Sequence, residues 1–157
     1  MMIRYYRPSD AQKISNLWLE ASLQAHSFVP ADYWRDMQDS IVLYYLPNAE
    51  TFVFEDKHQI KGFISIVDSK HIGALFVAPK FQSHKIGSKL LKYVQHKYPM
   101  LSLNVFVKNQ RALCFYQKNG FKIIAEKKEP STQEAELQMC WGLGCKSGFR
   151  KKYYGDS

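Results

Sequence analysis

A short basic segment, residues 78–88, links an apolar stretch to an amphipathic one. It carries Lys80, His84 and Lys85, and Gly87 lets the backbone come close to a ligand. When a strand runs through such a loop into a helix, unpaired backbone N–H groups and the positive end of the helix dipole point at one place. Such a place binds phosphate well. The segment therefore indicates a phosphate site, although a merely solvated connection has the same composition.

A second segment, residues 109–121, has the pattern of a short capped helix. Asn109 is a favoured N-cap residue, and Asn119-Gly120 is a favoured helix stop. Between them, Phe115 and Tyr116 stand at helical spacing. A capped amphipathic helix explains these positions one by one. It does not explain their complete spacing together with the upstream basic loop.

These two segments together resemble the GCN5-related N-acetyltransferase (GNAT) family. The coenzyme loop of that family reads Gln/Arg-x-x-Gly-x-Gly/Ala, and this chain has Gln82-x-x-Lys85-x-Gly87, with Lys85 in place of the first glycine. If that position needs a positive φ, a residue with a side chain costs on the order of 1 kcal/mol. Residues 109–121 match the family's Asn-x-x-Ala-x-x-Phe-Tyr-x-x-x-Gly-Phe signature at every fixed position. The resemblance covers roughly residues 2–142.

The resemblance implies an acetyl-CoA-dependent N-acetyltransferase that needs no metal. Acetyl-CoA would be the co-substrate and a primary amine the acceptor. The coenzyme arm would lie between two parallel strands that splay apart, with backbone N–H groups of Leu75, Phe76 and Val77 holding the thioester and the pantetheine amides. Asn109 and Phe115 would contact the coenzyme arm. The residues that would wrap the pyrophosphate are Gln82, Ser83, His84, Lys85, Ile86, Gly87 and Ser88.

Two catalytic residues follow from the same resemblance. Tyr116 matches the tyrosine that many members use as general acid toward the coenzyme A thiolate, and an unperturbed phenol pKa of ~10 makes proton sharing feasible. The alternative is a buried tyrosine with a satisfied hydroxyl. The strand before the loop has no carboxylate, so His71 is our first candidate for the general base and His26 the second. In a regular pleat His71 would share a face with Leu75.

A third block, His26-Ser27-Phe28 followed by Tyr33-Trp34, looks like one found in small bacterial protein lysine and N-terminal acetyltransferases. That subgroup would use His26, Phe28 and Tyr33 to bind the acceptor. Aromatic packing at an elbow between two helices explains the block equally well.

Hydrophobic periodicity predicts the elements that must position these residues. The order is β-αα-βββ-α-β-α-ββ, a mixed α/β (α+β) fold with a central mixed sheet whose parallel strands 71–77 and 101–107 splay apart. We expect one acetyltransferase domain over residues 1–142 and a basic tail over residues 143–157. The expected strands are 3–7, 51–54, 60–67, 71–77, 101–107, 121–125 and 136–141, and the helices begin near residues 11, 30, 86 and 109, the second one ending near Pro47.

Composition is consistent with this organisation. The chain has 157 residues, 46% of them hydrophobic and 23% charged, which suits one globular core. No apolar stretch approaches the ~20 residues of a membrane span, so we expect a cytoplasmic protein. Cys114 and Cys140 lie in helix and strand patterns and are expected to be buried free thiols, and the histidines show no metal-site spacing.

The acceptor stays open at this stage. A protein lysine or N-terminal amine is what the subgroup implies. The alternatives are a small-molecule amine acetyltransferase, a toxin-type acetylase acting on charged tRNA, and a non-catalytic acetyl-CoA-binding module. The formal net charge of +8 would repel cationic polyamines, and the tail lacks aromatic RNA-reading motifs beyond Tyr153-Tyr154. We therefore expect neither a membrane nor a nucleic acid as partner, and a monomer or homodimer.

Overall fold

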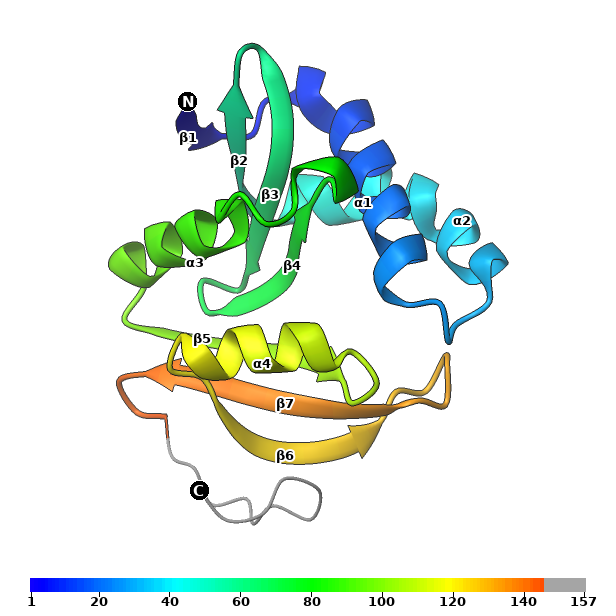
Figure 1. The fold of residues 1–157 in the computed structure, drawn as a ribbon, viewed down its shortest axis with the longest axis vertical. Coiled ribbons are helices and arrows are strands. Elements are labelled where there is room, and N and C mark those ends of the chain that lie inside the picture. The colour runs from blue at the N-terminus through cyan, green and yellow to red at the C-terminus, as the bar shows by residue number, and fades with distance from the viewer. Residues whose placement is uncertain (146–157) are drawn as a thin grey trace. The chain divides into compact units, whose positions relative to one another are not determined.

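The computed structural model describes residues 1–145, in two compact units, Met1–Tyr98 and a second one that starts at Pro99 (Figure 1). The element order along the chain is the predicted one. Of the predicted basic tail, residues 146–157 lie outside the described residues. No helix in the described part is long and apolar enough to cross a bilayer.

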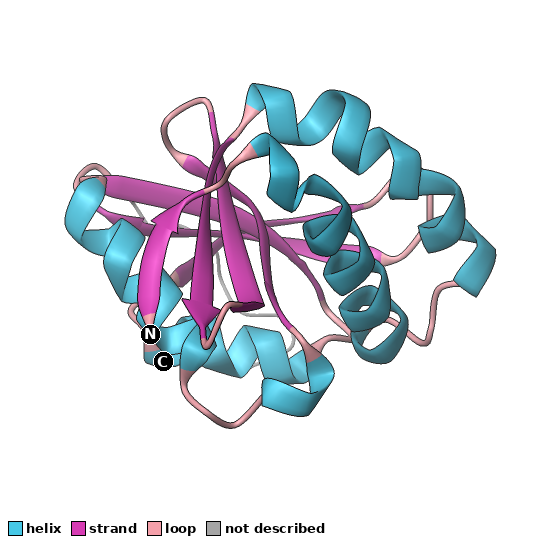
Figure 2. Ribbon diagram, turned by 90° about the horizontal axis from the view of Figure 1, so that it is seen from above, coloured by secondary structure: helices cyan, strands magenta, loops and turns pink. Residues whose placement is uncertain are grey.

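The first unit is built on four antiparallel strands in the order β1-β2-β3-β4. Helices α1 and α2 lie side by side next to this sheet, and α3 packs on it separately (Figures 1 and 2). The bounds are β1 Met2–Tyr5, α1 Ala11–Ala25, α2 Ala31–Ser40, β2 Glu50–Asp56, β3 Gln59–Val67, β4 His71–Val77 and α3 Ile86–Lys97.

The core of the first unit follows the predicted periodicity. Strands β2 and β3 are apolar on both faces and are buried through most of their length, as in strands covered from both sides. Each long helix buries one stripe, spaced three and four residues apart. In α1 the apolar stripe is Ile14, Leu17, Trp18 and Ala21, and in α3 it is Ile86, Leu90, Leu91 and Val94.

The second helix is interrupted where the sequence predicted a continuous one. Helix α2 ends at Ser40, a π-helical turn follows at Ile41–Tyr45, and a 3₁₀ turn at Leu46–Asn48 completes the segment. In the π turn the Leu46 N–H donates to the Ile41 carbonyl. The wider turn brings these two residues into line, and both are buried. Pro47, which has no N–H to donate, then prevents further α-helix.

Strand β4 carries a bulge at Gly73. Opposite it on β3, Ser65 pairs with Ala74 and Ile66 pairs with Ile72, so that Gly73 is the extra residue. The regular pleat that we expected for residues 71–77 is therefore wrong.

The bulge divides β4 between the two faces of the sheet. Leu75 pairs with Ile64, on the face where a side chain at Gly62 would meet α3. His71 pairs with Val67, and paired residues share a face. A side chain at Gly73 would meet Val67 too. His71 and Gly73 thus share a face, and Leu75 lies on the opposite one.

An ion cluster at the start of the chain ties β1 to its neighbours. The Arg4 guanidinium donates two hydrogen bonds to Asp10, at 2.9 and 3.1 Å, and two to Glu55, at 3.2 and 3.3 Å. Burial raises the Asp10 pKa, but the hydrogen bonds from Arg4 and from the Arg7 backbone N–H outweigh it and lower the pKa. The carboxylate is thus ionised at neutral pH and anchors the short edge strand.

The second unit is a three-stranded antiparallel sheet with one helix. Its strands are β5 Met100–Phe106, β6 Lys122–Lys128 and β7 Ala135–Gly142, in the order β5-β7-β6, and its helix is α4 Gln110–Lys118. Strand β5 alternates as predicted, with Leu101, Leu103 and Val105 buried. Val107, expected as its last residue, lies just beyond the strand and donates its N–H to the Ala135 carbonyl.

Two cysteine expectations are wrong. Cys140 of β7 forms a disulfide with Cys145, because the chain turns back after Gly142 and brings the two Cα atoms to 5.8 Å. Cys114 is a free thiol, but it is exposed, because it lies on the side of α4 opposite to the buried Leu113 and Tyr116.

Candidate active site

The loop between β4 and α3 has the geometry of an anion site. The first backbone hydrogen bond of α3 runs from the Lys89 N–H to the Lys85 carbonyl, so the N–H groups of Ile86, Gly87 and Ser88 have no acceptor within the helix. No side chain caps this helix end, and its first turn holds no acidic residue. The positive end of the helix dipole therefore meets no negative charge from the first turn.

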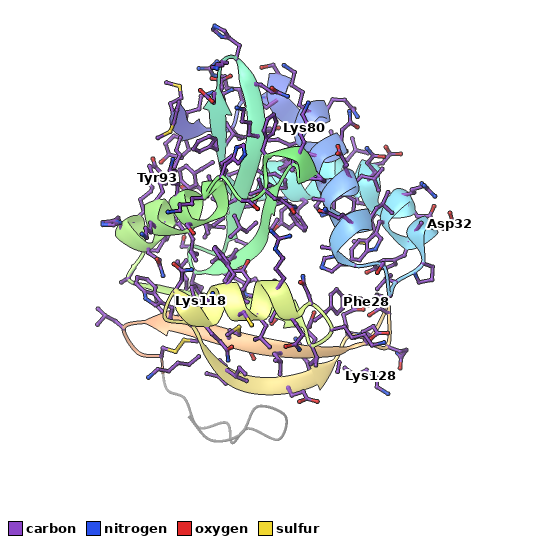
Figure 3. All side chains as sticks on the ribbon, viewed as in Figure 1. Phe28, Asp32, Lys80, Tyr93, Lys118 and Lys128 are labelled. Carbon is purple, nitrogen blue, oxygen red and sulfur yellow. A yellow bond between two sulfur atoms is a disulfide. The ribbon has the colours of Figure 1, made fainter. Side chains whose placement is uncertain are left out.

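Basic side chains surround this loop. The Lys80 amino group lies 5.2 Å from the centre of the Phe81 ring and Lys80 sits on the loop itself (Figure 3). The Lys61 amino group lies 4.4 Å from the same ring and also pairs with Asp56 at 3.0 Å. His84 lies against the other part of the loop, 6.4 Å from Phe81 between ring centres. The loop thus offers both backbone N–H groups and positive charge to a phosphate.

Lys85 stands in the left-handed conformation, with φ 62° and ψ 20°. The position where the family loop has its first glycine therefore has a positive φ in this chain. A residue with a Cβ pays about 1 kcal/mol there. Ser83, with φ 76°, is left-handed as well. Both strained residues lie in the loop that leads into α3.

Gln82, the first fixed residue of the loop motif, fastens the loop. Its side-chain amide donates to the Val77 carbonyl at 3.2 Å and to Gln24 of α1 at 3.0 Å. These bonds hold the loop against the end of β4. The structure thereby assigns Gln82 a positioning contact that the sequence analysis had not described.

Two helix caps explain the two ends of the α4 signature. The Asn109 side chain accepts a hydrogen bond from the Ala112 N–H at 3.2 Å, which accounts for the first fixed position. At the other end, Gly120 has φ 91°, its N–H donates to Gln117, and the next N–H donates to the Tyr116 carbonyl. This is the Schellman arrangement, which needs a residue that tolerates a positive φ.

Tyr116 lies on the buried face of α4 and packs against the residue that follows the cap. The rings of Tyr116 and Phe121 are 5.5 Å apart between centres, and Phe115 lies 5.2 Å from Tyr116. Burial raises the pKa of Tyr116 well above that of an ordinary phenol. The hydroxyl therefore keeps its proton at neutral pH and is able to donate a hydrogen bond.

The two candidate bases differ in their surroundings. His71 opens β4 and is half-buried on the face opposite to Leu75. His26 ends α1, is 8% exposed, and burial lowers its pKa to about 4. At neutral pH a group with that pKa is a weak base, which leaves His71 as the better candidate of the two.

The aromatic block lies at the elbow between α1 and α2, where Phe28 is found in Figure 3. His26 lies 5.0 Å from Trp34 and 5.8 Å from Phe28 between ring centres, and Tyr33 lies 4.8 Å from Trp34. His26 and Tyr33 thus both lie against Trp34, and Phe28 lies against His26. Acceptor binding by these three residues stays a prediction.

Comparisons with known proteins agree with this geometry. The family described as "Acetyltransferase (GNAT) domain" matches residues 17–135. The chain is 40% identical over 140 residues to the peptidyl-lysine N-acetyltransferase YiaC of Escherichia coli, covering 89% of this chain and 96% of that protein. It is also 30% identical over 122 residues to the peptidyl-lysine N-acetyltransferase YjaB of the same organism, covering 77% of this chain and 82% of the relative.

Solved structures share the fold. The solution structure of apo YjaB from Escherichia coli matches with a TM-score of 0.78 at 25% identity, over 92% of this chain and 98% of that one. A PaiA N-acetyltransferase from Thermoplasma acidophilum in complex with coenzyme A matches with a TM-score of 0.73 at 18% identity, over 90% and 98%. The predicted mixed α/β fold class is confirmed. The chain therefore belongs to the GNAT family and is an acetyl-CoA-dependent N-acetyltransferase that transfers an acetyl group to an amine.

Proposed function

We propose that this acetyltransferase modifies lysine side chains of proteins, with the residue 78–88 loop holding the pyrophosphate of acetyl-CoA. The observation that carries the coenzyme site is the start of α3, where three N–H groups without helical acceptors follow the left-handed Lys85. The lysine acceptor is supported by the two relatives named peptidyl-lysine N-acetyltransferases. That the protein works in the cytoplasm stays a prediction.

The coenzyme would be held mainly by backbone groups. The N–H groups of Ile86, Gly87 and Ser88 would donate to the pyrophosphate, and Lys85 would add a charge. Backbone N–H groups near Leu75, on the same strand that leads into this loop, would hold the thioester carbonyl. Asn109 and Phe115 would contact the coenzyme arm, as in the family pattern.

The chemistry requires a base, an oxyanion donor and a proton donor. Bound acetyl-CoA supplies an activated acetyl group. The neutral lysine amine forms the new C–N bond as the C–S bond breaks, and His71 takes the proton that the amine loses, directly or through water. The Tyr116 hydroxyl donates a hydrogen bond to the sulfur as it leaves with the bonding electrons. The backbone of β4 stabilises the negative charge on the carbonyl oxygen.

The test is acetyl-CoA turnover, followed with a thiol reagent, on peptides with a blocked N-terminus. A peptide with one lysine should release thiol and gain an acetyl group by mass spectrometry, and the same peptide with arginine in place of lysine should not. Acetyl-CoA should also raise the melting temperature. Turnover of spermidine or free amino acids with no turnover of any lysine peptide would redirect the proposal to a small-molecule acceptor. No melting shift at millimolar acetyl-CoA would exclude the coenzyme site.

A further inference from the structure

The π-helical turn at Ile41–Tyr45 places one hydroxyl at an unusual point of the sheet. The turn exposes Leu43 and Tyr44, while Tyr45 points inward and its hydroxyl is buried. Turns of this kind inside helices are frequent at functional sites.

The β4 bulge receives this hydroxyl. A Cβ built on Gly73 would collide with the Tyr45 hydroxyl oxygen, would lie 2.9 Å from the ring carbon that bears it, and 3.0 Å from a Val67 methyl group. Glycine at position 73 therefore creates the space that the hydroxyl fills. The face concerned is the one that carries His71, our candidate base, and it belongs to the strand whose later residues would hold the thioester.

The hydroxyl has no hydrogen-bond partner among the described residues. A buried polar group without a partner destabilises a fold, so such groups are usually replaced unless something else bonds to them. Burial also raises the pKa of Tyr45 to about 12. A phenol that stays neutral can accept a hydrogen bond from an amine and donate one of its own.

We propose that Tyr45 is an amine-binding residue, whose hydroxyl at the Gly73 bulge accepts a hydrogen bond from the nitrogen of the acceptor. The inference rests on the proposed function and adds to it the group that orients the attacking nitrogen. Tyr45 forms no covalent bond and takes no proton. Its contribution is the placement of the nitrogen lone pair toward the acetyl carbon.

The experiment compares Tyr45→Phe with a matched control. Tyr98→Phe removes a second buried hydroxyl that lacks a partner among the described residues, but at the end of α3. With a single-lysine peptide, Tyr45→Phe should lower kcat/KM for the peptide about 10-fold, the usual effect of one lost hydrogen bond. The KM for acetyl-CoA should not change. Both variants should melt at or above the parent temperature, and Tyr98→Phe should keep full activity.

Each other outcome has one meaning. Parent-like kcat/KM for the peptide in Tyr45→Phe overturns the inference. So does a lower melting temperature in this variant, because the hydroxyl would then hold the fold. An equal loss of activity in Tyr98→Phe would show a general effect of hydroxyl removal and would also overturn it.

A binding arm separates this inference from the proposed function. If the parent turns over no lysine peptide, the proposed acceptor is wrong, and calorimetry with coenzyme A present then decides the role of Tyr45. The parent should bind a lysine peptide about 10-fold more tightly than the same peptide with norleucine, which has the same chain but no amine. Tyr45→Phe should lose that preference. No preference in the parent, or the same preference in both proteins, would refute amine binding.

Discussion

The two units of this protein differ in which residues adopt a backbone conformation with positive φ. In the second unit, positive φ values fall on Gly120, Gly142 and Gly144, with Gln133 as the one exception among the described residues. In the first unit every such position that the structure describes has a side chain, and four of the six form the hairpin turns after β2 and β3. These six residues are Lys57, His58, Asp68, Ser69, Ser83 and Lys85.

Buried polar atoms without a hydrogen-bond partner also differ between the two units. Hydroxyl or indole groups of five first-unit residues are buried without a partner in the described structure, and the described part of the second unit has none. The five are Ser15, Ser22, Trp34, Tyr45 and Tyr98. The described part of the second unit thus places glycine at most positive-φ positions and has no buried polar side-chain atom without a partner. The first unit has strained non-glycine residues and buried polar atoms without hydrogen-bond partners. Natural proteins accept such local costs mainly where a ligand will bind.

The largest effect that we expect concerns acid stability and belongs to the first unit. The His26 pKa is lowered by burial from 6.5 to about 4, so the unfolded chain binds the proton more tightly. The stability that depends on a neutral His26 is fully present above pH 6.5. As the pH falls from there toward 4, the free energy of unfolding decreases by about 3 kcal/mol. Urea unfolding between pH 7 and pH 4 should show this loss in the parent, and a smaller one in His26→Gln. Parallel curves for the two proteins would contradict it.

The next prediction tests whether the second unit, despite its regular structure, takes part in the chemistry. Tyr116→Phe keeps the ring contact with Phe121 and removes only the hydroxyl. If the hydroxyl stabilises the departing thiolate, kcat should fall about 100-fold, with little change in the KM for acetyl-CoA. The melting temperature serves as the control and should stay within a degree or two of the parent. Parent-like turnover in Tyr116→Phe would mean that the tyrosine serves only in the core and that its hydroxyl takes no part in the reaction.

A smaller effect is expected at Lys85, where glycine can be placed at a positive-φ position, as at most such positions of the second unit. Lys85→Gly relieves the left-handed strain and should leave stability unchanged or raise it by up to about 1 kcal/mol. Lys85→Ala keeps the strain and removes the charge, so it should bind acetyl-CoA a few-fold more weakly, and added salt should narrow the difference. Thermal unfolding and calorimetry at two salt concentrations measure both effects. Equal affinity in all three proteins would mean that the Lys85 charge does not touch phosphate.

The smallest effect concerns the cap of α4. Asn109→Ala removes the acceptor for the Ala112 N–H and should cost about 1 kcal/mol of stability or less. Asn109→Ser restores a capping oxygen and should recover most of it. If acetyl-CoA affinity falls in both variants while stability recovers in the serine one, Asn109 also contacts the coenzyme. Unchanged stability in Asn109→Ala would show that the cap adds little to this helix.

Residues 109–121 show what the sequence could predict. Asn109 and Gly120 have local physical reasons, an N-cap and a Schellman turn, so pattern and structure agree at both ends of the helix. The strands and the two long apolar helix stripes were predictable from hydrophobic periodicity. Lys85 was predictable in part, since the family pattern marked the position as one for glycine.

The π turn and the β4 bulge were not predictable, because they depend on contacts between distant segments. Nothing near Tyr45 marks a wider helical turn, and Gly73 alone does not identify a bulge. We predicted the orientation of His71 from a regular pleat, and the bulge at Gly73 interrupts that pleat. The Cys140–Cys145 disulfide depends on the turn after β7, whose course the cysteine spacing does not fix.

The contact between Gly73 and the Tyr45 hydroxyl also has a consequence for how this sequence can change. Any side chain at position 73 enters the space of the aromatic residue at position 45, so position 73 can gain a side chain only if the residue at position 45 becomes smaller. Relatives that keep tyrosine or phenylalanine at 45 should keep glycine at 73, whereas alanine or serine at 73 should accompany a smaller residue at 45. A side chain at position 73 and an aromatic residue at position 45, which are 28 residues apart, should therefore not occur together in one relative.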